Sequence, residues 1–148
     1  MKLLFKGPVI ITGGSSQLGM ALARALREEG AKTLSVCRSS EGLARCGEAG
    51  LSCLPLDEPE SLPERCRGLL GEPPAHLVDL MHSRFESLIA GAAPEAIMEW
   101  AAVDIGLRPR LVRAVGRSML ARRFGRCVFV SSSAAGCPAE GQGYYAAA

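Results

Sequence analysis

Short apolar runs alternate with amphipathic stretches along the whole chain. Residues 8–11 are apolar throughout, as a strand buried on both faces of a parallel sheet requires. Further strand-like segments follow along the chain. The pattern therefore predicts five strands, at residues 8–11, 33–37, 51–56, 77–81 and 126–130.

Segments between these strands carry helical periodicity. Leucines recur every four residues from Leu18 until Gly30 supplies a stop. A longer helix is predicted over residues 105–123, where the apolar positions on one face are Leu107, Leu111, Val115 and Met119. Residues 55–74 are rich in proline, glutamate and arginine, and we expect them to hold a short helix on the surface.

Alternation of strands and helices implies right-handed crossovers and a mostly parallel sheet with helices on both faces. The sequence thus predicts one α/β domain over residues 1–148, a doubly wound, Rossmann-like sandwich of three layers. The segment beginning at Tyr144 resembles the first turn of a helix, and five strands would leave an apolar sheet edge uncovered. We therefore expect the chain to be an N-terminal portion that lacks the last strands and helices of its domain.

Composition and charge narrow the class of protein. With 48% hydrophobic and 22% charged residues, the 148-residue chain has the composition of an ordinary soluble globular protein. A net charge of +2, without aromatic residues interleaved among the basic ones, does not indicate nucleic-acid binding. The arginines between positions 108 and 126 are interpreted as a solvated helix face. No apolar run approaches the ~20 residues that would span a membrane.

The six cysteines indicate the cellular compartment and whether a metal site is expected. They show no Cys-x-x-Cys pair and no histidine at zinc spacing, so no metal site is predicted. Cys53 and Cys127 fall within strand-like apolar runs, where a thiol behaves as a small hydrophobe. We interpret all six as reduced thiols and expect a cytoplasmic protein.

The turn after the first strand has the residues of a phosphate-binding loop, Thr12-Gly13-Gly14-Ser15-Ser16-Gln17-Leu18-Gly19. Glycine permits positive φ and lets a phosphate approach the backbone without meeting a Cβ. The helix that follows offers free N–H groups and the positive end of its dipole. Because the turn lies directly between a buried strand and an amphipathic helix, it predicts a dinucleotide site formed by Thr12, Gly13 and Ser15 to Gly19. An ordinary strand–helix turn is the alternative.

This turn resembles the cofactor signature of the short-chain dehydrogenase/reductase family, Thr-Gly-x-x-x-Gly-x-Gly. Thr12, Gly13 and Gly19 match it, whereas Gln17 stands in place of the middle glycine. The resemblance continues in register along the chain. Asp57 is similar to the aspartate that contacts the adenine amino group, and Asp104 stands where the family has a helix asparagine.

Spacing links the remaining landmarks to the same family. Twenty-eight residues separate Asp104 from Ser132, and thirteen separate Ser132 from Tyr145. The resemblance implies that Tyr145 donates a proton to a carbonyl oxygen, that Ser132 hydrogen-bonds this oxygen, and that Asp104 holds a relay water. It also implies a lysine at position 149, one residue past the last. Ser133 is the alternative to Ser132, while Tyr144 lacks the thirteen-residue spacing.

One landmark of the family is replaced. After the fourth strand, where the family has Asn-Asn-Ala-Gly, this chain has His82-Ser83-Arg84-Phe85. His82 is predicted to line the cofactor pocket, with a role as proton carrier as the alternative, since imidazole titrates near pH 6.5.

The residues at the end of the second strand indicate which nicotinamide cofactor would bind. A carboxylate there would bind the ribose 2′-OH of NAD, whereas an arginine accommodates the 2′-phosphate of NADP. Arg38 and Ser39 occupy this position, with no acid before Glu41. The arginine fork suits a phosphate, so NADP is favoured over NAD.

Together these features predict an NADPH-dependent reductase of a ketone, resembling acyl-carrier-protein ketoreductases, with a small or carrier-linked carbonyl substrate. The alternative is a catalytically impaired relative that binds a nucleotide as a sensor or partner subunit, which Gln17, His82 and Asp104 favour. The resemblance also implies a homodimer or homotetramer, which sedimentation at micromolar concentration would test.

Overall fold

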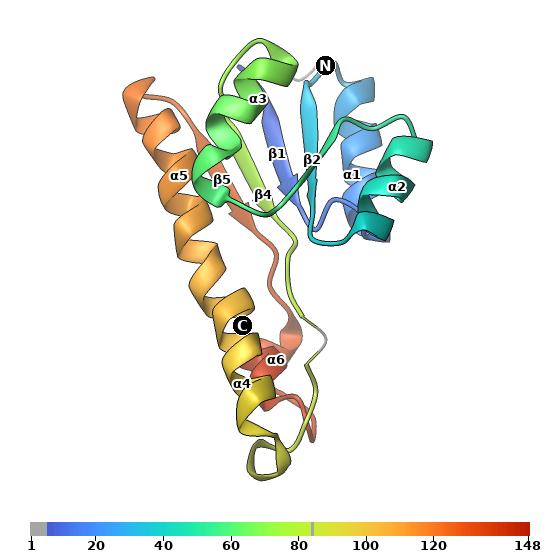
Figure 1. Ribbon diagram of the computed structural model, residues 1–148, viewed down its shortest axis with the longest axis vertical. Helices are drawn as coiled ribbons and strands as arrows, with labels where there is room; N and C mark the ends of the chain where they lie inside the picture. Colours follow the sequence, from blue (N-terminus) through green and yellow to red (C-terminus); the bar gives the residue numbers. More distant parts are fainter. Residues whose placement is uncertain (1–5, 84) are drawn as a thin grey trace.

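Five parallel strands form one sheet in the computed structural model, which describes residues 6–83 and 85–148 (Figure 1). The strand order across the sheet is β3-β2-β1-β4-β5. The predicted strands are confirmed, and the bounds differ from those expected by one or two residues: β1 Val9–Thr12, β2 Thr33–Cys37, β3 Cys53–Pro55, β4 His76–Asp79 and β5 Arg126–Phe129.

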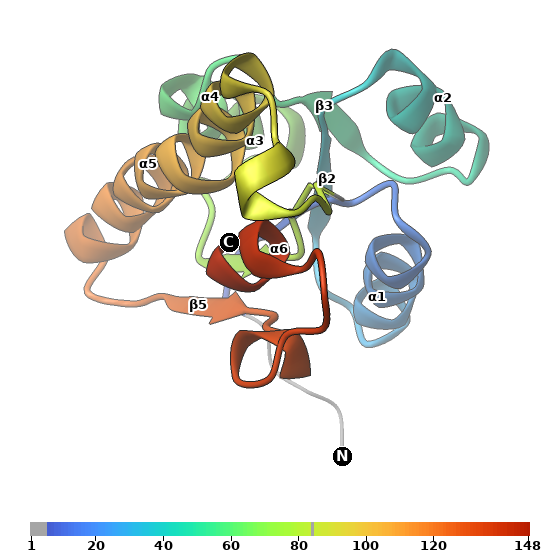
Figure 2. The same cartoon turned by 90° about the horizontal axis from the view of Figure 1, so that it is seen from below.

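Helices cover both faces of this sheet, so the expected doubly wound α/β sandwich is confirmed (Figure 2). One face packs against α1 and α2, and the other against α3 and α5. The α-helices of the described residues are α1 Gln17–Glu28, α2 Ser40–Glu48, α3 Leu62–Leu70, α4 Pro94–Trp100, α5 Leu107–Ala121 and α6 Gly143–Ala147.

Two of the shorter helices differ from the sequence prediction. The short helix α2 was not predicted. Gly42 and Gly47 leave it with few apolar side chains, too few to give a helical periodicity in the sequence. The expected surface helix within residues 55–74 is α3, but it is no mere surface element. Leu62 and Cys66 are fully buried and form part of the core on that face.

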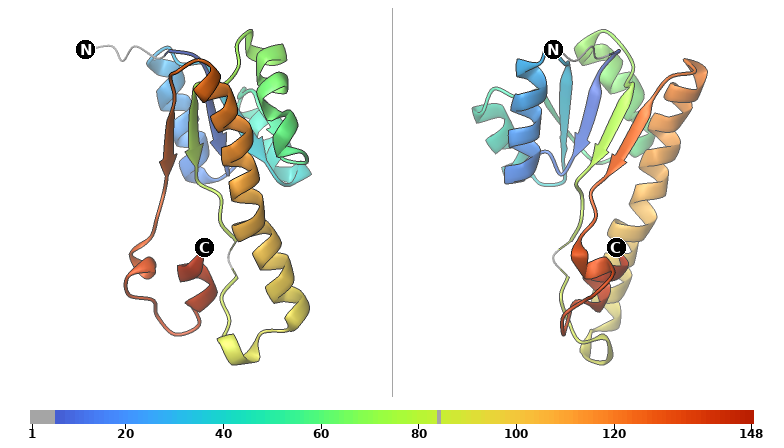
Figure 3. Two further views of the ribbon diagram at one scale, coloured as in Figure 1. Left: turned by 90° about the vertical axis from the view of Figure 1, so that its left-hand side faces the viewer. Right: turned by 180° about the vertical axis from the view of Figure 1, so that it is seen from behind.

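The longest helical segment begins earlier than predicted. α4, a π-helical turn at Ala101–Gly106 and α5 follow one another without a break, so the predicted start near residue 105 is wrong. This long helix extends well beyond the sheet, and its projecting end lies beside α6 in a small lobe (Figure 3). No helix in the described ranges is both long enough and apolar enough to cross a bilayer.

Two apolar layers hold the sandwich together. On one face, Ile10 and Leu77 pack with Leu111 and Val115 of α5. On the other, Val9 and Ile11 pack with residues of α1 and α2. Adjacent residues of β1 thus point to opposite faces, as a strand buried on both sides requires.

Helix α1 leaves part of its own face of the sheet bare. A hollow of about 700 Å³ lies over β4 and β5, lined by apolar side chains that include Leu22, Val78, Val128 and Val130. Val128 and Val130 are each about half exposed in the described structure.

The burial of α5 leads to a stability prediction. Leu111 is 0% exposed and Leu120, on the same helix, is 77% exposed. Leu111→Ala should lower the free energy of unfolding by about 2–5 kcal/mol, because it removes packed methyl groups and leaves a cavity. Leu120→Ala should change it by no more than about 0.5 kcal/mol. Denaturant unfolding of the two variants measures both; equal losses would contradict the packing described for α5.

Candidate active site

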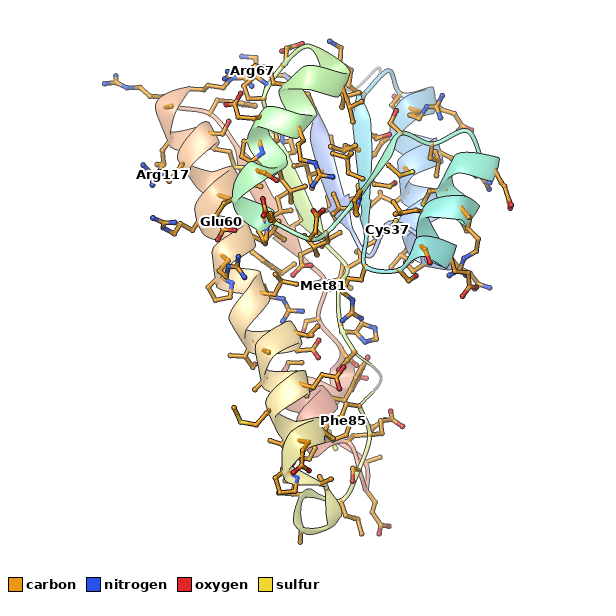
Figure 4. The ribbon with its side chains drawn as sticks, viewed as in Figure 1. Cys37, Glu60, Arg67, Met81, Phe85 and Arg117 are labelled. Carbon is orange, nitrogen blue, oxygen red and sulfur yellow. The ribbon has the colours of Figure 1, made fainter. Side chains whose placement is uncertain are left out.

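The candidate site lies at the carboxyl ends of β1 and β4. These neighbouring strands mark the point where the strand order reverses, and crevices at such points bind ligands in open α/β sheets. Thr12 pairs with Asp79 in the ladder between the two strands. Figure 4 locates this edge of the sheet, with Cys37 at the end of β2 and Met81 just beyond β4.

The turn after β1 depends on glycine for steric reasons. Gly13 has φ +65°, and a Cβ on it would lie 2.9 Å from the carbonyl oxygen of Leu80. A Cβ on Gly19 would lie 2.5 Å from the carbonyl oxygen of Gly13, because the first turn of α1 packs directly on the loop. Larger residues at these two positions would therefore push the loop open.

Helix α1 begins with donors free for an anion. Ser16 is its N-cap, and the Ser16 hydroxyl accepts the Gly19 N–H at 3.0 Å. The backbone N–H groups of Gln17 and Leu18 donate to no described acceptor in the protein. Both residues line a groove of about 960 Å³, together with Gly13, Ser15 and Ser16, with residues at the end of β2, and with the residues that follow β4.

These features fit the pyrophosphate of a dinucleotide. A pyrophosphate binds where free N–H groups at the start of a helix can donate to it and where the adjoining loop has no side chains in the way. Gln17 is exposed at the first position of α1, so its side chain borders the groove without closing the loop. Thr12 does not line the groove; its hydroxyl donates to Asp79 Oδ1 instead.

The end of β2 forms the far wall of the same groove. Arg38 and Ser39 line it as predicted, and Arg45 of α2 joins them. Ser39 caps α2, with its hydroxyl accepting the Gly42 N–H at 3.1 Å. No carboxylate is among the groove's described lining residues, so the wall offers cationic donors for a phosphate.

Asp57 lies away from this wall. Its carboxylate accepts hydrogen bonds from the Glu58 N–H at 2.9 Å and from Arg65 at 2.6 Å. These two donors, the backbone N–H foremost, hold the pKa of the exposed Asp57 carboxyl below its usual value. Asp57 is not among the described lining of the groove, and its adenine contact stays a prediction.

Tyr145 and Ser132 line one pocket. This pocket of about 480 Å³ lies beside the groove and also includes Ser16, Leu80 and His82. The Ser132 oxygen accepts the Ala134 N–H at 3.2 Å, which leaves the hydroxyl hydrogen free to donate. Two residues separated by thirteen positions in the sequence thus line the same pocket in the folded chain.

Burial distinguishes the alternatives that the sequence left open. Tyr144 is buried, packs against the rings of Phe85 and Trp100, and hydrogen-bonds the carbonyl oxygen of Ile89 at 3.4 Å. Its neighbour Tyr145 faces the pocket. Ser133 lines only a second, outer pocket of about 410 Å³, whereas Ser132 and Tyr145 line both.

His82 lies where the groove and the two pockets meet, and it lines all three. Its ring stands edge-on to that of Tyr145, with centroids 5.2 Å apart at an angle of 84°. Nδ1 lies 3.0 Å from the Ser83 carbonyl oxygen, an acceptor, so Nδ1 carries the hydrogen in this contact. Nε2 has no hydrogen-bond partner among the described residues. Arg84, the third residue of the replaced family segment, is outside the described residues.

Asp104 is buried in the π-helical turn, and it lines neither pocket beside Tyr145. One carboxylate oxygen accepts the Ser83 N–H at 2.7 Å. The other has no partner among the described residues, which leaves an acceptor available for a water. Its predicted catalytic role therefore rests on the sequence resemblance, while its observed contact holds the segment that carries His82.

Two residues of the site escaped the sequence analysis. Asp79, at the end of β4, has its side chain 1% exposed, and Arg108 of α5 bonds it at 2.6 Å from Nε to Oδ2. Arg108 also lines the pocket of Tyr145 and Ser132. It was interpreted as part of a solvated face, which is wrong for this arginine.

Metal ligands do not gather at the site. Over residues 6–83 and 85–148, no three or more His, Cys, Asp and Glu side chains are grouped so as to hold an ion. The cysteines are free. Cys37, which lines the groove, and Cys46 are buried with their sulfurs 3.6 Å apart. Burial and this contact raise the pKa of the Cys46 thiol to about 12, which makes it a poor nucleophile.

Comparison with known proteins defines the class of fold. No family model and no curated sequence matches the chain. Among solved structures, a short-chain type dehydrogenase/reductase from Mycobacterium ulcerans is 21% identical, with a TM-score of 0.83 over 95% of this chain and 56% of that one. Actinorhodin polyketide ketoreductase, solved with NADPH, is 24% identical, with a TM-score of 0.82 over 95% and 59%. The Cj0485 dehydrogenase is 16% identical, with a TM-score of 0.78 over 96% and 57%.

These matches show that the chain has the fold of short-chain dehydrogenase/reductase structures, as the sequence resemblance implied. The chain spans between 56% and 59% of the length of the three structures it matches.

The close packing at Gly19 leads to a prediction about the turn. Gly19→Ala should lower both stability and dinucleotide affinity, by roughly 1–3 kcal/mol in stability, because its Cβ must displace the Gly13 backbone. Gly47→Ala is the control: nothing lies within 4 Å of its Cβ, and it should gain up to about 1 kcal/mol of helix stability. Thermal unfolding and fluorescence titration with NADPH measure the two effects. Unchanged affinity in Gly19→Ala would mean that the cofactor does not use this turn.

Proposed function

We propose that this protein is an NADPH-dependent oxidoreductase of the short-chain dehydrogenase/reductase family that reduces a ketone. The observation that carries the proposal is the shared pocket of Tyr145 and Ser132, which opens beside the groove at the start of α1. Proton donor, oxyanion partner and dinucleotide groove are thereby neighbours, as carbonyl reduction requires. The fold shared with dehydrogenases and a ketoreductase supports the same function.

Carbonyl reduction needs a hydride at carbon and a proton at oxygen. A bound nicotinamide dinucleotide supplies the hydride; the groove residues Gly13, Gln17 and Leu18 would hold its pyrophosphate. Tyr145 gives its hydroxyl proton to the oxygen as negative charge grows there. Ser132 donates its free hydroxyl hydrogen to the same oxygen and stabilises that charge.

The proposed substrate is a small ketone or a 3-oxoacyl group linked to a carrier. The pocket of about 480 Å³ and the outer pocket of about 410 Å³ are continuous in their lining through Ser132, Tyr145 and His82. Such a pair of hollows can accept a carbonyl at the inner end and the rest of the substrate at the outer end. We also propose that the protein works as a homodimer or homotetramer.

NADPH is the proposed cofactor because Arg38 and Arg45 line the groove without an opposing carboxylate among its described residues. Replacing Arg38 with Asp should weaken NADPH binding about tenfold or more and bring it close to that of NADH. A charge-assisted hydrogen bond to the 2′-phosphate contributes about 1.5–3 kcal/mol, and 1.4 kcal/mol is a tenfold change in affinity. Fluorescence titration of both cofactors measures the ratio.

Arg24→Asp makes the same charge change on the exposed face of α1, away from the groove lining, and should leave the NADPH/NADH ratio unchanged. Equal affinities of the wild type for the two cofactors would contradict the assignment of Arg38.

Tyr145→Phe tests the proton donor. It should lower kcat and kcat/KM of ketone reduction together by about 10²–10⁴-fold, with NADPH affinity nearly unchanged, because the hydroxyl acts on the transition state. Ser132→Ala should cost about 10²–10³-fold through the loss of one donor to the oxyanion. Steady-state kinetics with a panel of ketones measures these losses in the intact protein.

Tyr144→Phe is the matched control, since among the described residues its hydroxyl contacts only the Ile89 carbonyl oxygen, at 3.4 Å, and Tyr144 does not line the pocket. It should retain near-normal turnover. Normal turnover of Tyr145→Phe would refute the proposed acid. NADPH binding without reduction of any ketone would instead favour the nucleotide-binding sensor or partner subunit.

A further inference from the structure

Arg108 holds together elements that are distant in the sequence. Its Nε donates to Asp79 Oδ2 at 2.6 Å, and one terminal nitrogen donates to the carbonyl oxygen of Met81. The other terminal nitrogen donates to the main-chain oxygen of Ala148, directly after α6. One planar guanidinium on α5 thereby joins the end of β4 to the end of the helix that carries Tyr145.

Asp79 extends this set of contacts to the cofactor side. Its Oδ1 accepts the Thr12 hydroxyl at the start of the glycine-rich turn and the Met81 N–H at 3.1 Å. Hydrogen bonds therefore run from the turn, through Asp79 and Arg108, to the end of α6. We call Thr12, Asp79 and Arg108 the brace.

The other arginines of α5 make no comparable contact among the described residues. Arg110 forms an exposed pair with Glu60, while Arg117 lies on the outer side of the helix, away from the site (Figure 4). Arg108 is 22% exposed on its side chain, and that exposed part borders the pocket of Tyr145 and Ser132. The geometry of Arg108, rather than its charge alone, distinguishes it from these arginines. Its three acceptors lie on two segments, residues 79–81 and Ala148, and a planar fork of donors can meet all three.

We propose that Arg108 is a positioning residue, which sets the place of Tyr145 relative to the glycine-rich turn through the brace. The inference rests on the proposed function, in which Tyr145 donates its proton to a carbonyl held beside the cofactor groove. Displacement of a catalytic group by about 1 Å can cost ~10²-fold in rate. Loss of the Arg108 contacts releases α6 from β4 and leaves the glycine-rich turn in place, so turnover should fall while cofactor binding persists.

The experiment uses the intact protein and distinguishes two roles of Arg108: positioning Tyr145, and neutralising the charge of Asp79. Arg108→Met leaves the Asp79 carboxylate buried without its cation, which destabilises the fold. The double variant Asp79→Asn/Arg108→Met removes that unpaired charge, and the amide oxygen of the introduced asparagine still accepts from Thr12 and Met81. We expect the double variant to recover the thermal unfolding midpoint but to remain about 10²-fold low in kcat, with NADPH affinity within about threefold of the wild type.

Arg108→Lys gives a second test, because lysine keeps the charge but offers a point donor that cannot meet three acceptors in one plane. It should unfold near the wild-type temperature and still lose at least about tenfold in kcat. Arg117→Met is the control on the same helix and should keep wild-type turnover. Full recovery of kcat in the double variant or in Arg108→Lys would overturn the proposal and leave Arg108 as a counter-ion only.

Amide hydrogen exchange reports the position of α6 without any enzymatic assay. The Ala146 N–H donates to the Gln142 carbonyl oxygen at 2.8 Å. In the double variant this amide should exchange roughly tenfold faster, while the amides within α1 keep their wild-type rates. Unchanged exchange at Ala146 would refute the brace even if the protein reduces no ketone. Faster exchange in a protein without reductase activity would refute the proposed function alone.

Discussion

The buried carboxylate of Asp79 is the group on which the geometry of the site depends. An ionised carboxylate removed from water is very costly unless charge and hydrogen bonds compensate it. Its compensation comes from three segments of the chain: the hydroxyl of Thr12 on β1, the N–H of Met81 after β4, and the guanidinium of Arg108 on α5. Because each donor must reach the same two oxygens, their segments can meet in only a narrow range of positions.

The segment after β4 serves as a common wall. Leu80 lies against Gly13, which has no side chain to block the approach, and it also lines the groove and the pocket of Tyr145 and Ser132. His82 continues this wall to the outer pocket and meets the ring of Tyr145. Asp104 holds this segment in place by accepting a hydrogen bond from the N–H of Ser83. The stretch from Leu80 to His82 therefore borders both the groove and the pocket of Tyr145.

Two adjacent tyrosines take opposite roles because they lie on a helix. Successive helical side chains point about 100° apart, so only one of the pair can face the core. Tyr144 packs between Phe85 and Trp100 in the small lobe, which turns Tyr145 toward Ser132 and His82. The long helix contributes to both sides of this arrangement, with Trp100 near one end and Arg108 two turns further along.

Local pattern was enough to predict the strands, the helix after β1 and the glycine-rich turn, because burial on both faces and phosphate-loop sterics act over a few residues. Spacing and family resemblance singled out Tyr145 and Ser132. Only the tertiary structure decided which of α5's arginines lies inside, since Arg108 has no local feature that separates it from Arg110 or Arg117. The ion pair with Asp79 joins residues 29 positions apart, and a buried pair of that kind forms only when two elements pack. The same holds for α2 and for the early start of the long helix, whose contacts come from distant segments.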